Sequence, residues 1–124
     1  MSTHCKRLSE ILGRAIRFVP DVGGDEAIEE IGKMSEGDII FLDNVRGNPE
    51  EYGKMYDSNE ETESTELVTR LSAVSDVYVT DAFAAAHRRS PTLTGFTNSM
   101  PCVAGNLMEG EISSLRIALR NPPK

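Results

Sequence analysis

Residues 39–42 read Ile-Ile-Phe-Leu, and this run of four apolar side chains constrains the fold of the chain more than any other feature. A strand that faces water on one side alternates apolar and polar residues, whereas a strand covered on both faces is continuously apolar. The segment 38–45 is therefore predicted to be a strand buried on both faces. Such strands belong to parallel sheets with helices on each face, so the run indicates an α/β fold.

Helical and extended patterns alternate on both sides of this strand. The predicted order is helix 5–13, strand 15–19, helix 25–34, strand 38–45, loop 47–64, helix 64–74, strand 76–83 and a final helix from about residue 104 to residue 120. Strands that alternate with helices imply right-handed crossovers and a parallel sheet. We expect one domain with a partial doubly wound, Rossmann-like sheet, of which only three strands lie in this chain.

Local signals mark where several of these helices begin and end. Gly13 stands where the cap of the first helix is expected. Acidic Asp25 and Glu26 suit the positive end of the next helix dipole. The acidic end of loop 47–64 is interpreted as the solvated start of a helix rather than as a binding tail.

The charge balance restricts which anions the chain can bind. With 20 acidic and 13 basic residues, its formal net charge is -7 at pH 7. Such a chain is a poor electrostatic match for nucleic acid or an anionic membrane, so we expect neither as a partner. Any anion that binds has to be held by a local group of positive side chains.

The sequence shows no pattern typical of a membrane span, a signal peptide or a metal site. The chain shows neither the roughly 18–20 consecutive apolar residues of a membrane span nor the apolar core of a signal peptide, so a cytoplasmic location is expected. Cys5 and Cys102 lie far apart and belong to no C-x-x-C pair or zinc-type set. Both are predicted to be thiols, and no metal ligand is assigned.

Two of the predicted strands end in positive side chains. The strand at 38–45 is followed by Arg46, and the strand at 76–83 leads to His87, Arg88 and Arg89. Ligands of open parallel sheets bind beyond the carboxyl ends of the strands, so these side chains are expected on one rim. An arginine there could hold a phosphate or carboxylate through paired hydrogen bonds.

Each of these residues also has a purely structural interpretation. Arg46 could be a surface charge, and Arg89 could be solvated. Asp81, at the end of the second strand, could cap a turn instead of taking part in chemistry. His87 could serve packing or hydrogen bonding alone. Spacing by itself leaves the anion site and these alternatives open.

Three motifs in order resemble the phosphoglycerate kinase family. They are DIIFLDNVRGNPEE at 38–51, DVYVTDAFAAAHRRSPTLTGF at 76–96 and PCVAGNLMEGEISSL at 101–115. The first is similar to the E-N-x-R-F strand followed by paired glutamates, the second to D-x-Y-V-N-D-A-F-G-x-A-H-R, and the third to A-G-x-L-M-x-x-E-L. The resemblance extends from about Leu8 to Leu119, and D-A-F-x-x-A-H-R is its most specific part.

The resemblance implies a reversible transfer of a phosphoryl group from 1,3-bisphosphoglycerate to ADP, which gives 3-phosphoglycerate and ATP with Mg²⁺. Members have two doubly wound domains, of which the N-terminal one holds phosphoglycerate and the C-terminal one holds the nucleotide. Arg46 and Arg88 match arginines that contact the phosphate end of 3-phosphoglycerate, and His87 matches a histidine of the same basic patch. These three residues are the expected substrate-binding residues, and no catalytic residue is assigned.

Several departures from the family pattern limit these expectations. The early strand with its aspartate, asparagine and arginine is absent, as are the S-H-x-G-R-P segment and the glycine-rich nucleotide half. Residues 1–124 are thus expected to be the later part of the N-terminal domain, without the nucleotide-binding C-terminal domain and without a bound Mg²⁺ or nucleotide. Single departures from the motifs are Asp43, Gly47, Thr80, Ala84 and Ser90, the last at a position where many members carry a second histidine.

We therefore expect a phosphoglycerate kinase fragment that carries part of the 3-phosphoglycerate site and has no phosphoryl transfer activity by itself. The alternative is a non-enzymatic α/β binding or interaction module that keeps the fold. The parent enzyme is expected to be a monomer, whereas the fragment is expected to self-associate through a sheet edge exposed by the missing strands.

Overall fold

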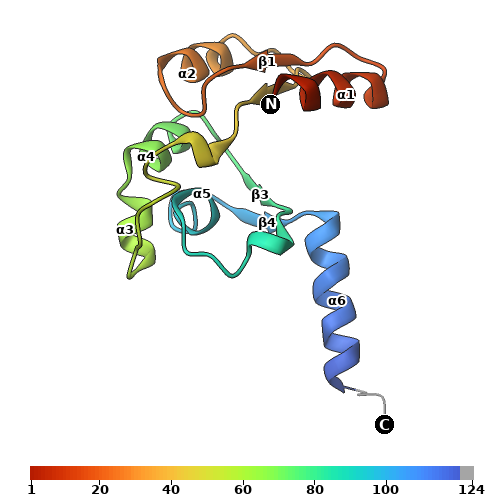
Figure 1. The fold of residues 1–124 in the computed structure, drawn as a ribbon, viewed down its shortest axis with the longest axis vertical. Helices are drawn as coiled ribbons and strands as arrows, with labels where there is room; N and C mark the ends of the chain where they lie inside the picture. The colour runs from red at the N-terminus through yellow and green to blue at the C-terminus, as the bar shows by residue number, and fades with distance from the viewer. Residues whose placement is uncertain (121–124) are drawn as a thin grey trace.

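The computed structural model describes residues 1–120 as an α/β chain with four short parallel strands in two separate pairs (Figure 1). Strand β1 (Arg17–Val19) pairs with β2 (Ile40–Leu42), with Phe18 opposite Phe41. Strand β3 (Tyr78–Thr80) pairs with β4 (Cys102–Ala104). The helices are α1 (Ser2–Leu12), α2 (Asp25–Gly32), α3 (Asn59–Glu63), α4 (Glu66–Ser72), α5 (Pro91–Thr94) and α6 (Asn106–Arg120), with two 3-10 turns, η1 (Val45–Gly47) and η2 (Phe83–Ala85).

The four helices predicted from apolar spacing are confirmed as α1, α2, α4 and α6. Gly13 caps α1 with φ at 63°, a left-handed conformation that glycine adopts without strain. The acidic end of the predicted loop does start a helix, since Glu60 and Glu61 lie in the first turn of α3 and Ser58 accepts a hydrogen bond from the Glu61 N–H. That helix is a separate one within the predicted loop, because α3 ends at Glu63 and Thr65 caps α4 anew. Local capping chemistry therefore sets these boundaries.

The prediction of three strands in one sheet is wrong in number and arrangement. A fourth strand, β4, follows Pro101, and no strand among residues 1–120 joins the β1–β2 pair to the β3–β4 pair. β4 is as short as the other strands, but Pro101 and Gly105 flank it, so the sequence shows no longer apolar run at this place. The final helix accordingly begins at Asn106 instead of near residue 104.

The prediction that the strand at 38–45, now β2, is buried on both faces is also wrong. Ile40, Phe41 and Leu42 are all only half-buried. Helices α1 and α2 pack on β1, the partner strand, rather than centrally over β2. The strand is continuously apolar, but residues 1–120 cover its two faces only in part.

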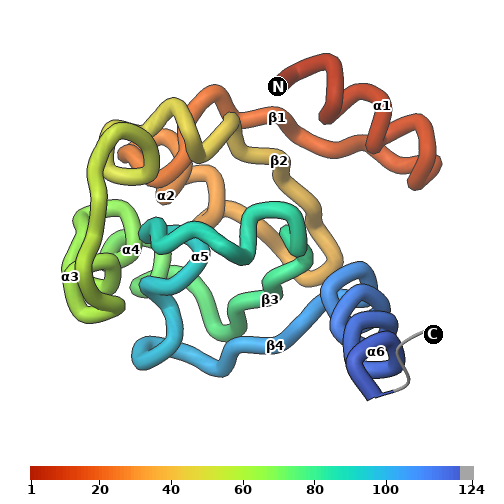
Figure 2. Tube along the Cα trace, turned by 60° about the horizontal axis from the view of Figure 1, so that its bottom comes forward, coloured from red at the N-terminus to blue at the C-terminus, as the bar shows by residue number. Residues whose placement is uncertain are grey.

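A group of buried side chains lies where α3, α4 and α5 meet. Figure 2 shows these three helices grouped on one side of the molecule. Thr62 of α3 is fully buried and its hydroxyl lies 3.0 Å from that of Thr94. Phe96 follows α5 and stacks on Tyr78 of β3 with ring centroids 4.9 Å apart. This stack attaches the helical group to β3, the strand that precedes His87, Arg88 and Arg89.

Helix α6 begins on the body of the molecule and then projects away from it (Figure 1). Met108 in its first turn is buried, but Leu115 is 50% and Leu119 81% exposed. The predicted apolar stripe of this helix is therefore covered only near its start. Within residues 1–120, every helix is too short or too polar to cross a membrane.

Candidate functional site

Arg46 and Arg88 line one open pocket of about 270 Å³, although 42 residues separate them in the sequence. Arg46 lies in η1, the first turn after β2, and Arg88 lies three residues after η2, the first turn after β3. The expectation that the two strand ends share a rim is therefore confirmed for these arginines. Other hollows of about 300 and 380 Å³ exist, but in the one beside α2, Arg17 and Lys33 already pair with Glu30. In the arginine pocket, by contrast, neither arginine is paired with a carboxylate among residues 1–120.

Arg46 is placed by its own turn. The side chain of Asn44 accepts a hydrogen bond from the Arg46 N–H at 3.1 Å, and the Asn44 carbonyl accepts one from the Gly47 N–H at 2.9 Å. The guanidinium lies 4.5 Å from the centre of the Tyr52 ring, a cation–π contact that limits where it can swing. Arg46 nevertheless remains exposed, so the ring orients its guanidinium while leaving its N–H donors accessible to a ligand.

Arg88 is placed by the alanine turn that follows β3. The Arg88 N–H donates to the Ala85 carbonyl at 2.9 Å, which closes the chain directly after η2. Alanine side chains are small enough for this turn to lie close to the strand end. Among residues 1–120, neither Arg88 nor Arg46 forms an ion pair with a carboxylate. Both guanidinium groups are therefore free to meet an anion.

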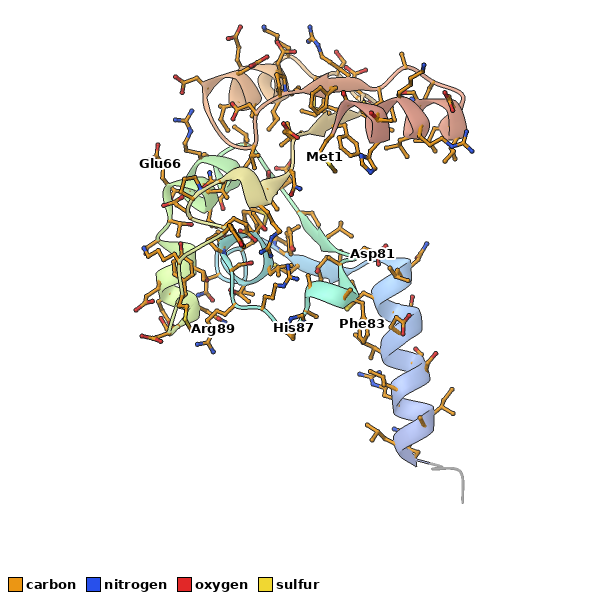
Figure 3. All side chains as sticks on the ribbon, viewed as in Figure 1. Met1, Glu66, Asp81, Phe83, His87 and Arg89 are labelled. Carbon is orange, nitrogen blue, oxygen red and sulfur yellow. The ribbon has the colours of Figure 1, made fainter. Side chains whose placement is uncertain are left out.

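His87 and Arg89 do not line this pocket. Both are exposed, and Figure 3 shows them on the outer side of the segment that leads from η2 towards α5. Arg89 donates to the backbone carbonyl of Asp57, which ties this segment to the start of the α3 region. The predicted basic group thus divides into Arg88, which faces the pocket, and two neighbours that do not.

Asp81 caps a helix, the structural alternative that its position allowed. Its carboxylate accepts a hydrogen bond from the Met108 N–H in the first turn of α6 at 2.8 Å (Figure 3). The carboxylate approaches the chain so closely that a Cβ on Gly105 would lie 2.5 Å from the Asp81 Cγ. The residue after β3 therefore fixes α6 to the end of the strand.

Sequence reasoning missed Glu51 and Ser90, which also line the arginine pocket. Glu51 is 9% exposed and accepts hydrogen bonds from the Ser90 hydroxyl at 2.6 Å and the Thr92 N–H at 2.9 Å. Tyr78 lies beside them and donates to the Thr92 carbonyl at 2.7 Å, and burial raises the pKa of its phenol. No local pattern predicts a contact over 39 residues, and the only hint was that Glu51 closes the first motif.

The described part of the chain offers no metal centre. Within residues 1–120, no three His, Cys, Asp or Glu side chains are grouped so that they could hold a metal ion. We therefore assign no step to Mg²⁺ at this site. The chemistry that the pocket supports is the binding of an anion by two guanidinium groups.

Comparison with known proteins adds a family to this geometry. The sequence model of the family "Phosphoglycerate kinase" matches residues 1–124. Proteins described as phosphoglycerate kinase from Methanobacterium bryantii and Methanothermus fervidus are 43% and 46% identical over 124 residues, which is 100% of this chain and 30% of each relative. The crystal structure of the phosphoglycerate kinase of Pyrococcus horikoshii matches 99% of this chain with a TM-score of 0.92 at 38% identity, and the match covers 30% of that structure. The chain spans about 30% of the length of these relatives.

Proposed function

The chain belongs to the phosphoglycerate kinase family and corresponds to an N-terminal portion of it, and from this we propose that it binds the phosphate end of 3-phosphoglycerate or 1,3-bisphosphoglycerate. Arg46 and Arg88 are the proposed phosphate-binding residues. The observation that carries the proposal is that both line one pocket while neither is paired with a carboxylate among residues 1–120.

The chemistry of the pocket suits a phosphate monoester. Each guanidinium is permanently charged and can donate two parallel hydrogen bonds to phosphate oxygens. The two arginines enter from separate strand ends, so they can contact different oxygens of one phosphate. His87 is proposed as an outer member of the same basic patch, since it is exposed beside Arg88 and does not line the pocket itself.

The reaction proposed for the whole protein is the reversible transfer of a phosphoryl group between 1,3-bisphosphoglycerate and ADP. Phosphoryl transfer depends mainly on positioning and on neutralising charge, and the two arginines would supply both at the substrate end. Mg²⁺ with the nucleotide would neutralise the transferred group. We propose that the nucleotide site lies in a separate C-terminal domain, and that in the whole protein strands from outside residues 1–120 join the β1–β2 and β3–β4 pairs into one doubly wound sheet.

Titration of the ¹⁵N-labelled chain with 3-phosphoglycerate tests the binding step. The amide resonances of residues 44–48 and 85–89 are expected to shift, with a dissociation constant that rises with salt because the contacts are electrostatic. Arg46→Ala and Arg88→Ala are each expected to weaken binding about tenfold, since each removes charge-assisted hydrogen bonds. Arg116→Ala is the matched control, because Arg116 is an exposed arginine on α6.

Two results would contradict the proposal. One is that neither arginine loop shifts at saturating 3-phosphoglycerate, and the other is that Arg116→Ala weakens binding as much as Arg88→Ala. Either result would favour the alternative of a non-enzymatic α/β module that has kept the fold of the family.

A further inference from the structure

We propose that Glu51 is a positioning residue of the phosphate site, which holds the loop carrying Arg46 against the segment carrying Arg88. Residues 43–56 are called the first arginine loop here, and residues 81–92 the second arginine loop. The inference rests on the proposed function, because it concerns the residues proposed to bind phosphate. Glu51 itself touches no phosphate in this proposal and acts through the two arginines.

Both carboxylate oxygens of Glu51 are committed to the second arginine loop. Oε1 accepts from the Ser90 hydroxyl at 2.6 Å, and Oε2 accepts from the Thr92 N–H at 2.9 Å. Ser90 is 8% and Glu51 9% exposed, so water competes little for these bonds. Ser90 stands two residues after Arg88, and the contact therefore fixes the backbone from which Arg88 extends.

Within the first arginine loop, short hydrogen bonds connect Glu51 to Arg46. The Asn48 N–H donates to the Val45 carbonyl at 2.9 Å, and the Asn48 carbonyl accepts from the N–H groups of Glu51 and Tyr52, both at 3.1 Å. Tyr52 in turn lies under the Arg46 guanidinium. A displacement of Glu51 would therefore move the turn and the ring that place Arg46.

The neighbouring Glu50 performs a different task. Its carboxylate accepts hydrogen bonds from the N–H groups of Glu66 and Leu67, at 3.2 and 2.9 Å, at the start of α4. Glu50 does not line the arginine pocket. The two adjacent glutamates thus anchor one loop to two different places, and only the contact of Glu51 reaches the second arginine loop.

Because Glu51 is negatively charged, a charge effect and a positioning effect predict opposite changes in phosphate binding when it is removed. A carboxylate that lines a pocket for phosphate repels the ligand, so its removal should tighten binding if charge were its only effect. If Glu51 positions the arginines, loss of its hydrogen bonds should weaken binding instead. Glutamine keeps the shape of the side chain, and its amide can still accept from the Thr92 N–H and donate to the Ser90 hydroxyl.

The test compares three variants of the chain by titration with 3-phosphoglycerate. Glu51→Ala is expected to weaken binding about fivefold to tenfold, since it releases two buried hydrogen bonds. Glu51→Gln is expected to bind at least as tightly as the unmodified chain. Glu50→Ala, which loses two hydrogen bonds to a helix start, is the matched control and is expected to stay within about twofold. If Glu51→Ala does not fold, Ser90→Ala takes its place and is expected to weaken binding in the same direction.

A ligand-free measurement separates this inference from the proposed function. In the absence of phosphate, Glu51→Ala should shift the amide resonances of Arg88 and speed hydrogen exchange of the Thr92 amide, whereas Glu50→Ala should leave both unchanged. The inference is overturned if these signals do not respond, if Glu51→Ala tightens binding, or if Glu50→Ala weakens it as much. Failure of the unmodified chain to bind 3-phosphoglycerate would overturn the phosphate role of Glu51 together with the proposed function, and the exchange data would still show whether Glu51 joins the two loops.

Discussion

Two aspartates do the same work at the ends of two strands. Asp21 follows β1 by two residues and accepts hydrogen bonds from the N–H groups of Val22, Gly24 and Ala27, and thereby caps α2. Asp81 follows β3 directly and caps α6 through Met108. In each case a carboxylate beyond a strand holds the positive end of a helix at the rim of a strand pair.

Asp21→Ala is expected to lower the free energy of unfolding near pH 7 by about 1–2 kcal/mol, because it leaves helix N–H groups without a partner. Burial alone would raise the pKa of Asp21, but the N–H groups of Ala27, Gly24 and Val22 outweigh it, so the pKa in the folded chain lies below its ordinary value. The carboxylate therefore stabilises the fold above the unfolded pKa of about 3.9, and this contribution is lost as the pH falls through the lower folded value.

Urea unfolding at a series of pH values measures this effect. The difference between the unmodified chain and Asp21→Ala should be constant above about pH 5 and shrink as the solution is acidified further. Asp76→Ala, at an exposed aspartate before β3, is the control and should change stability by less than about 0.5 kcal/mol at every pH. A difference for Asp21→Ala that grows on acidification would contradict the assignment.

The positions of single residues could be predicted from the sequence where they depend on the strand that precedes them in the chain. Arg46 lies four residues after the end of β2 and Arg88 eight residues after the end of β3, and the rule that ligands of parallel sheets bind beyond the strand ends predicted that both lie on one rim. Ser90 and Glu51 could not be paired in this way, because their contact is set by tertiary packing across 39 residues. The departure from the family histidine at Ser90 was visible, but its partner was not.

Among the elements, the group α3, α4 and α5 depends on one small residue. Gly95 follows α5, and a Cβ at this position would lie 2.7 Å from the Pro91 carbonyl oxygen, 2.7 Å from the Val68 Cγ2 and 2.9 Å from the Thr62 carbonyl oxygen. Two of these atoms belong to backbone, which cannot move aside as a flexible side chain can. The three helices can approach one another this closely only because residue 95 has no side chain.

Gly95→Ala is therefore expected to destabilise the chain by about 1–3 kcal/mol, as overpacked cores do. Gly110→Ala is the matched control, since position 110 lies inside α6 with nothing within 4 Å of a new Cβ. It should stabilise by about 0.5–1 kcal/mol, because alanine favours a helix over glycine. Equal melting temperatures for the two variants would show that the three helices do not pack on Gly95.

Element prediction failed where a short element had no longer pattern around it. All four strands have three residues, but β1, β2 and β3 lie within the longer segments 15–19, 38–45 and 76–83, whereas β4 stands between Pro101 and Gly105. α5 has only four residues, too few for a period of 3.6 to be recognised. By contrast α6 has 15 residues, and its stripe of Met108, Ile112, Leu115 and Leu119 was predicted from spacing alone. The strand pairing of β4 with β3 was set by the return of the chain through α5, which no local pattern encodes.

For the molecule as a whole, apolar surface is left uncovered on the β3–β4 pair and along α6, among other places. Val79 of β3 and Val103 of β4 are 57% and 48% exposed, and the far end of the α6 stripe stands in solvent. Self-association through a sheet edge therefore stays a prediction. Each strand has only three residues, however, and a short edge offers few backbone groups to a partner. On α6, Leu115 and Leu119 of the stripe are 50% and 81% exposed.

We accordingly expect the chain to self-associate reversibly through α6, since burying exposed leucines removes apolar surface from water. In sedimentation velocity experiments, the weight-average sedimentation coefficient should rise with concentration. The double variant Leu115→Glu with Leu119→Glu should abolish that rise, because it places two charges in the stripe. The control, Asn106→Glu with Ser113→Glu, adds the same charge on the opposite face of the helix and should leave association unchanged. If the two double variants behave alike and both still associate, the sheet edges rather than α6 hold the copies together.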